Sequence, residues 1–121
     1  MDVVNRKDVP SFITKDTCEI REIMSPANST IERQSLAEAT LAPGRSTVLH
    51  IHETVEEIYY IMSGEGVMFI EGEERDVFAG DAIANLPGKR HKITNTGDEP
   101  LVFLCICTPR YTHEDTVLIE E

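Results

Sequence analysis

The sequence has little positive charge. Lys and Arg contribute 11 residues against 22 Asp and Glu, which gives a formal net charge of −11 at pH 7. Nucleic acids are bound by clustered Lys and Arg, so this composition argues against a nucleic-acid partner. It argues equally against an anionic membrane surface. With 121 residues, the chain is long enough for one domain with its own core, but not for two.

Long apolar runs are also missing. No segment approaches the roughly 20 apolar residues that cross a bilayer, and the opening MDVVNRKDVP lacks the apolar stretch of a signal peptide. We therefore expect a cytoplasmic protein that does not bind membranes. The three cysteines, Cys18, Cys105 and Cys107, form no CxxC pair, so neither a disulfide framework nor a zinc ribbon is indicated. The last two lie in LVFLCIC and are interpreted as small buried residues of an apolar strand.

Glycine is absent before residue 44, and all seven glycines fall between residues 44 and 97. They punctuate the chain at segments such as SGEG, EGEE and AGDA, which are typical of turns. Short segments rich in Val, Ile, Thr, Phe and Tyr lie between them, at 46–51, 56–62, 66–71, 81–86, 91–95 and 100–107. Strands at this spacing predict an all-β sandwich or barrel of antiparallel strands, with successive hairpins over 63–88.

Residues 29–44 are ambiguous, because SLAEATLA has helical propensity. The all-β context favours a strand, and we predict one there. Residues 1–29 are expected to form an N-terminal lead-in that could contribute an edge strand. Residues 30–121 are expected to form one β-barrel domain, closed by a C-terminal strand, TVLIE, that covers a sheet edge.

Histidine is scarce, with four in the chain, and two of the four are His50 and His52. Side chains alternate across a strand, so these two imidazoles share one face. Glu57 follows at the start of the next strand, which would carry it back beside them. His91 opens a later strand, and a barrel brings such non-adjacent strands together. Three imidazoles and one carboxylate would suit one divalent transition metal ion: Fe, Mn, Ni, Co or Zn.

These residues resemble the first motif of the cupin family. That motif begins at Gly44, continues after five residues with His50 and His52, and after four more reaches Glu57. It ends six residues later at Gly64, and every fixed position matches. The alternative carboxylate, Glu56, does not satisfy the six-residue gap.

The second cupin motif follows in register. It begins at Gly80, continues with DAIAN and LPG, residues 86–88, and ends with His91 and Asn95. Only the proline position departs from the pattern, because Leu86 occupies it and a proline stands next to it. This change affects the stiffness of the loop rather than metal ligation. The resemblance covers about residues 30–108.

The resemblance implies a small single-domain cupin, a jelly-roll barrel also called a double-stranded β-helix. Carried over position by position, the metal ligands are His50, His52, Glu57 and His91. It also implies a small-molecule substrate and a homodimer formed through sheet edges or a swapped N-terminal strand. The first expectation for activity is a non-haem, metal-dependent oxygenase. The alternatives are a metal-dependent isomerase, epimerase or lyase of the sugar or sugar-phosphate type, and a non-catalytic small-ligand binding protein.

Several further residues are assigned roles. Tyr59 should face inward beside Glu57, which makes it the candidate catalytic residue, whereas Tyr60 should face away and pack in a core. The motif glycines should supply turn conformations, and Asn95 should hydrogen-bond backbone groups near a turn. His113 lies outside both motifs and is expected to be solvated. Lys89 and Arg90 flank His91 and are expected to be plain surface residues, with anchoring of an anion as the alternative.

Overall fold

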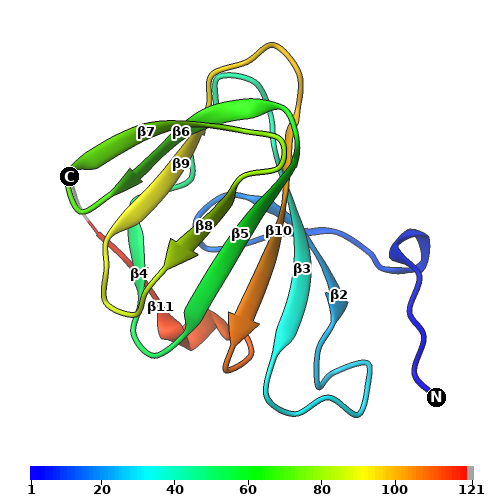
Figure 1. Ribbon diagram of the computed structural model, residues 1–121. Helices are drawn as coiled ribbons and strands as arrows, with labels where there is room; N and C mark the ends of the chain where they lie inside the picture. The colour runs from blue at the N-terminus through cyan, green and yellow to red at the C-terminus, as the bar shows by residue number, and fades with distance from the viewer. Residues whose placement is uncertain (120–121) are drawn as a thin grey trace.

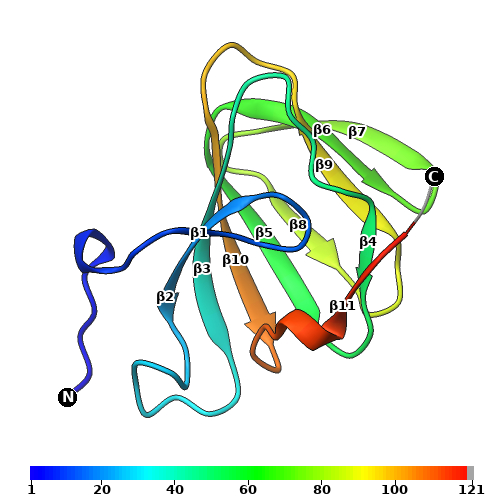
Figure 2. The same cartoon turned by 180° about the vertical axis from the view of Figure 1, so that it is seen from behind.

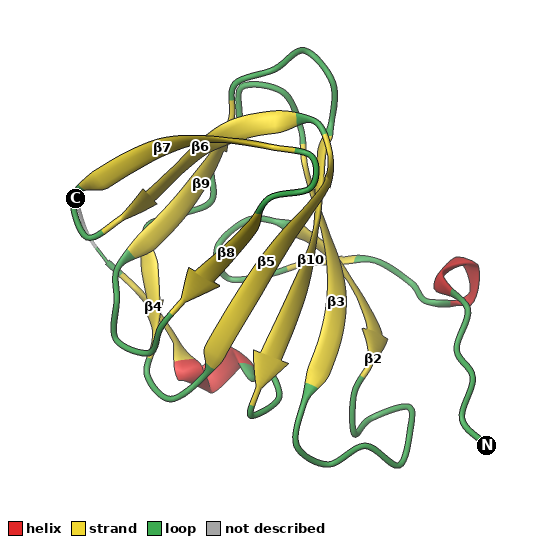
Figure 3. Ribbon diagram, in the orientation of Figure 1, coloured by secondary structure: helices red, strands yellow, loops and turns green. Residues whose placement is uncertain are grey.

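The chain folds into two antiparallel β-sheets that face each other and converge into a barrel (Figures 1 and 3). The computed structural model describes residues 1–119. One sheet has the order β1 (Phe12–Ile13), β2 (Glu19–Met24), β3 (Ser35–Leu41), β10 (Leu101–Thr108), β5 (Glu56–Ser63) and β8 (Ala82–Asn85). The other has the order β11 (Thr116–Leu118), β4 (His50–His52), β9 (His91–Asn95), β6 (Glu65–Ile70) and β7 (Glu73–Phe78). The predicted all-β class is confirmed.

The ambiguous segment is a strand over its second half, since β3 spans Ser35–Leu41. The predicted strand 46–51 is wrong in extent, because β4 contains only His50–His52. The expected C-terminal strand covers Thr116–Leu118, and its predicted end, Glu120, lies outside the described residues. Two single-turn 3-10 helices, η1 (Arg6–Asp8) and η2 (His113–Asp115), complete the elements. No helix among the described residues combines the length and the apolar character needed to cross a membrane.

Strand alternation builds the core. In β10, Leu101, Phe103, Cys105 and Cys107 point inward and are buried, while the residues between them are half-exposed. Tyr59 and Ile61 of β5 continue this layer across the sheet, because Tyr59 is paired with Cys105 and Ile61 with Phe103. The cysteines therefore do pack as small buried residues, as their apolar surroundings indicated.

The four motif glycines occupy left-handed backbone conformations, with φ between +76° and +95°, which confirms the turn roles expected of them. Gly64 is the most constrained of them. A Cβ at this position would lie 2.7 Å from the Pro100 carbonyl oxygen and 3.0 Å from the Leu101 Cα, so any side chain would collide with backbone atoms. Its φ of +87° is also one that other residues resist.

The Asn95 side chain joins backbone groups from two segments that are far apart in the sequence. Its side chain is fully buried, and its Nδ2 donates to the carbonyls of Leu41 (2.9 Å) and Glu99 (2.8 Å). Its Oδ1 accepts from the Gly97 backbone N–H at 2.9 Å. The predicted backbone-bonding role is confirmed, and one side chain joins the end of β3 to the 95–99 turn.

The outer face of the larger sheet is apolar. Ile58, Tyr60 and Met62 project outward from β5 and are 44%, 39% and 51% exposed. Leu104 and Ile106 of β10 lie beside them, because Leu104 is paired with Tyr60 and Ile106 with Ile58. Tyr60 thus faces away from Tyr59, as alternation predicts. The expectation that it packs in a core is wrong, because its ring lies on the surface.

Two segments from opposite ends of the chain meet at one mouth of the barrel (Figure 2). The loop between β1 and β2 is tied to the approach to β4 by a backbone hydrogen bond from Val48 N–H to the Asp16 carbonyl, 3.0 Å. Lys15 Nζ donates to the Thr116 carbonyl at 2.8 Å, which joins the same loop to β11. These two hydrogen bonds hold residues 14–18 next to β11 and next to β4, which carries His50 and His52.

Candidate metal centre

Three histidines form a buried cluster between the sheets. His50 and His52 share the inner face of β4, and His91 on β9 is the direct cross-strand partner of His50. Their exposed fractions are 0%, 4% and 1%. One ring nitrogen from each lies within 4.8 Å of the other two. The sequence prediction that separate strands bring these residues together is therefore confirmed.

The other ring nitrogen of each histidine is held by an oxygen atom. His50 Nδ1 lies 2.6 Å from the Val48 carbonyl oxygen, and His91 Nδ1 lies 3.2 Å from the Lys89 carbonyl oxygen. His52 Nδ1 lies 3.2 Å from the Thr116 hydroxyl of β11. A carbonyl can only accept, so His50 and His91 carry their proton on Nδ1. Their Nε2 lone pairs are then free to bind a ligand, the arrangement found around metal-ligating histidines.

Glu57 turns toward this cluster from β5. Its Oε1 lies 3.3 Å from His52 Nε2 and 3.7 Å from His91 Nε2, and its side chain is 5% exposed. Ligand atoms at about 2.0–2.2 Å from one ion are separated from their neighbours by roughly 3.0–3.5 Å. The neighbouring Glu56 is exposed on the opposite face of the strand, so the structure brings in the carboxylate that the motif spacing selects.

Buried polar atoms without partners mark the same place. Within the described residues, the buried side-chain atoms that find no hydrogen-bond partner are His50 Nε2, His91 Nε2, Glu57 Oε1 and both amide atoms of Asn85. Leaving such atoms unpaired in a protein interior costs several kcal/mol. A divalent cation would satisfy the two nitrogens and the carboxylate oxygen together, so the residues present fit a metal ion.

The pKa values match the geometry. Burial, reinforced by the neighbouring His50, lowers the pKa of His91 to about 4, which keeps the imidazole neutral. Burial likewise lowers the pKa of His50. Burial alone would lower the pKa of His52 and raise that of Glu57, but the attraction between the two groups, whose Nε2 and Oε1 atoms lie 3.3 Å apart, reverses both shifts. Glu57 is therefore a carboxylate, the form that binds a cation.

Three residues of the centre lie outside the sequence-predicted set. Asp16, on the β1–β2 loop, places Oδ2 3.5 Å from His50 Nε2. The Cys107 thiol donates to Glu57 Oε2 at 3.2 Å, and burial together with the Glu57 charge raises the pKa of this thiol. Asn85 is the cross-strand partner of Glu57 and is 1% exposed. Only Asn85 carried a signal in the sequence: alternation in DAIAN points it inward with Ile83.

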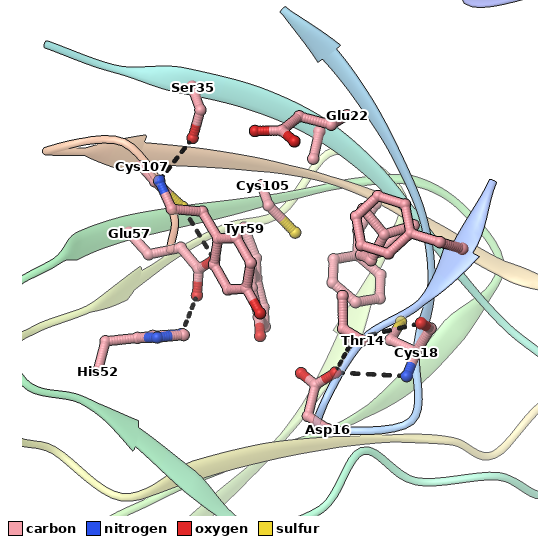
Figure 4. A pocket seen from close by; sticks show the side chains of 16 residues that line it. Thr14, Asp16, Cys18, Glu22, Ser35, His52, Glu57, Tyr59, Cys105 and Cys107 are labelled. Atoms are coloured by element: carbon pink, nitrogen blue, oxygen red, sulfur yellow. Dashed lines mark hydrogen bonds and ion pairs between the residues drawn. The ribbon is translucent and has the colours of Figure 1, made fainter. Parts of the chain in front are cut away.

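A pocket opens beside the cluster, and Figure 4 shows its lining side chains. His52 and Glu57 lie at one end, and Asp16 lies across from Glu22. Most of the wall is apolar. Its larger side chains are Phe12, Ile20, Tyr59, Phe103 and Tyr111. All three cysteines of the chain also line it. The cavity has a volume of about 40 Å³, and of the three clustered histidines it is His52 that lines it, together with Glu57.

The remaining predicted residues lie as follows. Tyr59 lines the pocket, and its ring packs edge-on against His91 with centroids 5.9 Å apart. Burial raises the pKa of its hydroxyl well above the ordinary value, so it is a proton donor rather than a base. Its catalytic role stays a prediction. His113 is exposed in η2 and is not a member of the cluster. Arg90 pairs with Glu71 at 2.9 Å on the surface, and Lys89 is exposed beside it.

Comparison with known proteins gives a family match. The family model described as the cupin domain matches residues 37–107. An uncharacterized protein of Methanocaldococcus jannaschii is 46% identical over 93% of this chain and 90% of its own length. The oxalate-binding protein of Thermotoga maritima is 37% identical over 76% of each chain. The polyketide cyclase RemF of Streptomyces resistomycificus superposes with a TM-score of 0.83 over 100% of this chain and 87% of its own, at 21% identity, a likeness of fold.

Proposed function

Since the chain belongs to the cupin family, we propose that it is a divalent-metal-dependent enzyme acting on a small organic molecule. The ion would be Fe, Mn, Ni, Co or Zn, held by His50, His52, Glu57 and His91. The observation that carries this proposal is the orientation of the three imidazoles. Their Nδ1 atoms are engaged by oxygen partners, and the Nε2 atoms of His52 and His91 lie within 3.7 Å of Glu57 Oε1.

The chemistry that such an ion supplies is Lewis acidity, which polarises a carbonyl or hydroxyl oxygen of a bound molecule. The surrounding residues prepare this role. Glu57 offsets part of the positive charge, and the Cys107 thiol holds Oε2 so that Oε1 faces the histidines. The apolar walls of the pocket exclude water from the bound molecule, which strengthens electrostatic interactions inside. Asp16 is placed to accept or hold a proton beside His50.

The lining side chains favour a non-oxidative reaction over an oxygenase. Cys18, Cys105 and Cys107 all line the pocket. The Cys107 thiol also donates a hydrogen bond to Glu57, a proposed metal ligand. Burial raises the pKa of all three thiols, so they stay protonated and do not decide between the two reactions. The nearby carboxylate of Asp16 suits proton transfer, as an isomerase or a lyase requires. An oxygenase is the second candidate function, because it would use the same proposed metal ligands as an isomerase or a lyase.

The test begins with elemental analysis of untagged protein purified without chelators. We expect about one equivalent of a transition metal, and no uptake on reconstitution would contradict the proposal. Metal-loaded protein is then incubated with a panel of small aromatic hydroxyketones, with and without oxygen, and products are identified by mass spectrometry. Turnover without oxygen supports the Lewis-acid enzyme, whereas turnover only with oxygen uptake supports the oxygenase. Thermal stabilisation without any product would leave a ligand-binding protein.

We further propose that two copies of the chain form a homodimer. The apolar outer face of β5 and β10 favours contact through a sheet face rather than through an edge. Exposed contiguous apolar patches of this kind mark interaction sites on proteins. A second copy could bury Ile58, Tyr60 and Met62 against their own counterparts, as two-fold symmetric contacts do.

A charge at the centre of this face should separate the copies. Tyr60→Glu is expected to elute as a monomer at micromolar concentration in size-exclusion chromatography with light scattering, whereas wild type elutes as a dimer. The matched control is Phe78→Glu, which alters an aromatic side chain of similar exposure, 51%, on the other sheet. If both variants remain dimeric, the interface lies elsewhere. If wild type is monomeric, the homodimer itself is refuted.

A further inference from the structure

We propose that Asp16 makes this site select against dianionic ligands such as oxalate and favour uncharged ones. The inference rests on the proposed function, because it concerns ligands bound beside the metal ion. It deepens that function by naming the substrate class: a small uncharged molecule that offers carbonyl or hydroxyl oxygens to the ion and an apolar body to the pocket.

The position of Asp16 carries the first step. Its Oδ2 is 3.5 Å from His50 Nε2, and its side chain is 15% exposed. Its other oxygen, Oδ1, accepts from the Thr14 hydroxyl and from the Cys18 backbone N–H. Those two bonds fix the carboxylate on its loop (Figure 4), with Oδ2 directed to His50 Nε2. A ligand entering beside His50 would therefore meet a negative charge at close range.

The loop that carries Asp16 is braced on several sides. Thr14 N–H donates to the Cys18 carbonyl at 3.0 Å, and Thr17 N–H donates to the Thr14 carbonyl at 2.9 Å. The Asp16 carbonyl accepts from Val48 N–H, which precedes β4, and Lys15 reaches the Thr116 carbonyl. A carboxylate held on such a framework cannot move away from an anionic ligand without breaking these contacts.

The rest of the pocket adds no compensating positive charge. Among the described residues that line it, three are carboxylates, Asp16, Glu22 and Glu57, and none is a lysine or an arginine. A divalent ion together with the carboxylates of Glu57 and Asp16 makes the centre neutral. Oxalate would add two negative charges to that neutral, mostly buried centre, and a buried charge without a partner is costly. An uncharged ligand avoids this cost.

The proposal predicts that this chain differs in its choice of ligand from the oxalate-binding protein of Thermotoga maritima, to which it is 37% identical. Membership of one family does not fix the ligand, because the groups around the site decide which molecule binds there. In this chain the proposed deciding residue is Asp16. It lies in the β1–β2 loop, outside residues 37–107, which match the family model.

The experiment uses three ligands of the same shape and different charge: oxalate, oxamate and oxamide carry two, one and no negative charges. Their affinities are measured by calorimetry on metal-saturated wild type and on Asp16→Asn, an isosteric change that removes the charge. Metal affinity is measured first in both proteins. We expect Asp16→Asn to bind oxalate about a hundredfold more tightly and oxamate about tenfold more tightly, on the order of tenfold per ligand charge. Oxamide should be unaffected.

Glu22→Gln is the matched control, because it removes a carboxylate from the same pocket on the side across from Asp16. Its oxalate affinity should stay within about threefold of wild type, since the charge effect falls with distance and screening. Equal gains for oxalate and oxamide in Asp16→Asn, or no gain for either, would overturn the inference and leave the metal-dependent function standing. A large loss of metal affinity in Asp16→Asn would also overturn it, because Asp16 would then be a ligand. Wild type that takes up no metal would refute both proposals.

Discussion

Replacing His91 with alanine will abolish tight binding of a divalent transition metal while the barrel stays folded. The imidazole contributes an Nε2 atom 3.7 Å from Glu57 Oε1, and its Nδ1 is already engaged by the Lys89 carbonyl. Without it, two histidines and one carboxylate remain, and the donor set has lost a neutral ligand whose pKa is held at about 4. We expect metal affinity to fall at least a hundredfold, measured by competition with a chromogenic chelator.

The effect should also appear in thermal unfolding. A ligand that binds only the folded state stabilises it by about 2.7 kcal/mol at a free concentration 100 times Kd. Added metal should therefore raise the Tm of wild type and leave that of His91→Ala almost unchanged. Removing a buried imidazole with an unpaired Nε2 should cost the metal-free protein little, because the lost contacts are offset by relief of an unsatisfied polar atom.

The control is His113→Ala, which changes an exposed histidine of η2. It should bind metal as wild type does, and His52→Ala should behave like His91→Ala. The ligand assignment is wrong if His113→Ala strips the metal, or if His91→Ala retains it with wild-type affinity.

Local patterns, together with the resemblance to the two cupin motifs, predicted the fold and the centre of the site. Alternation along β4 put His50 and His52 on one face, and the resemblance to the first cupin motif, with its six-residue gap to Gly64, selected Glu57 over its exposed neighbour Glu56. Glycine marked the turns because several of these turns require a positive φ. Each of these inferences depends on residues close together in the chain, where a short pattern determines the geometry.

Contacts between distant segments could not be predicted in this way. Asp16 reaches His50 across 34 positions only because the β1–β2 loop folds over the barrel mouth. Cys107 looked like a plain core residue, and its bond to Glu57 depends on β10 and β5 being neighbours in register. Alternation placed Tyr60 on the outer face of the sheet. It does not determine whether another layer covers that face, and here Tyr60 is 39% exposed.

The two buried asparagines should differ strongly in their response to substitution, and Asn95 has the larger expected effect on stability. Asn95→Ala would leave the carbonyls of Leu41 and Glu99 and the N–H of Gly97 without their partner. Unmade hydrogen bonds at buried groups cost about 1–3 kcal/mol each, although Glu99 is exposed enough for water to replace its bond. We expect a loss of roughly 3 kcal/mol or more in the free energy of unfolding, measured by urea denaturation.

Asn85 is the matched control, because its side chain is 1% exposed against 0% for Asn95, yet its amide finds no partner among the described residues. Asn85→Ala removes an unsatisfied polar group, and this gain offsets the packing lost with the side chain. Its free energy of unfolding should therefore stay within about 1 kcal/mol of wild type. A loss as large as that of Asn95→Ala would mean that Asn85 is bonded in solution and stabilises the barrel. If the loss of stability is small and the metal-loaded variant binds ligands more weakly, the Asn85 amide belongs to the functional site beside Glu57. The unsatisfied amide would then destabilise the fold slightly but contribute to ligand binding.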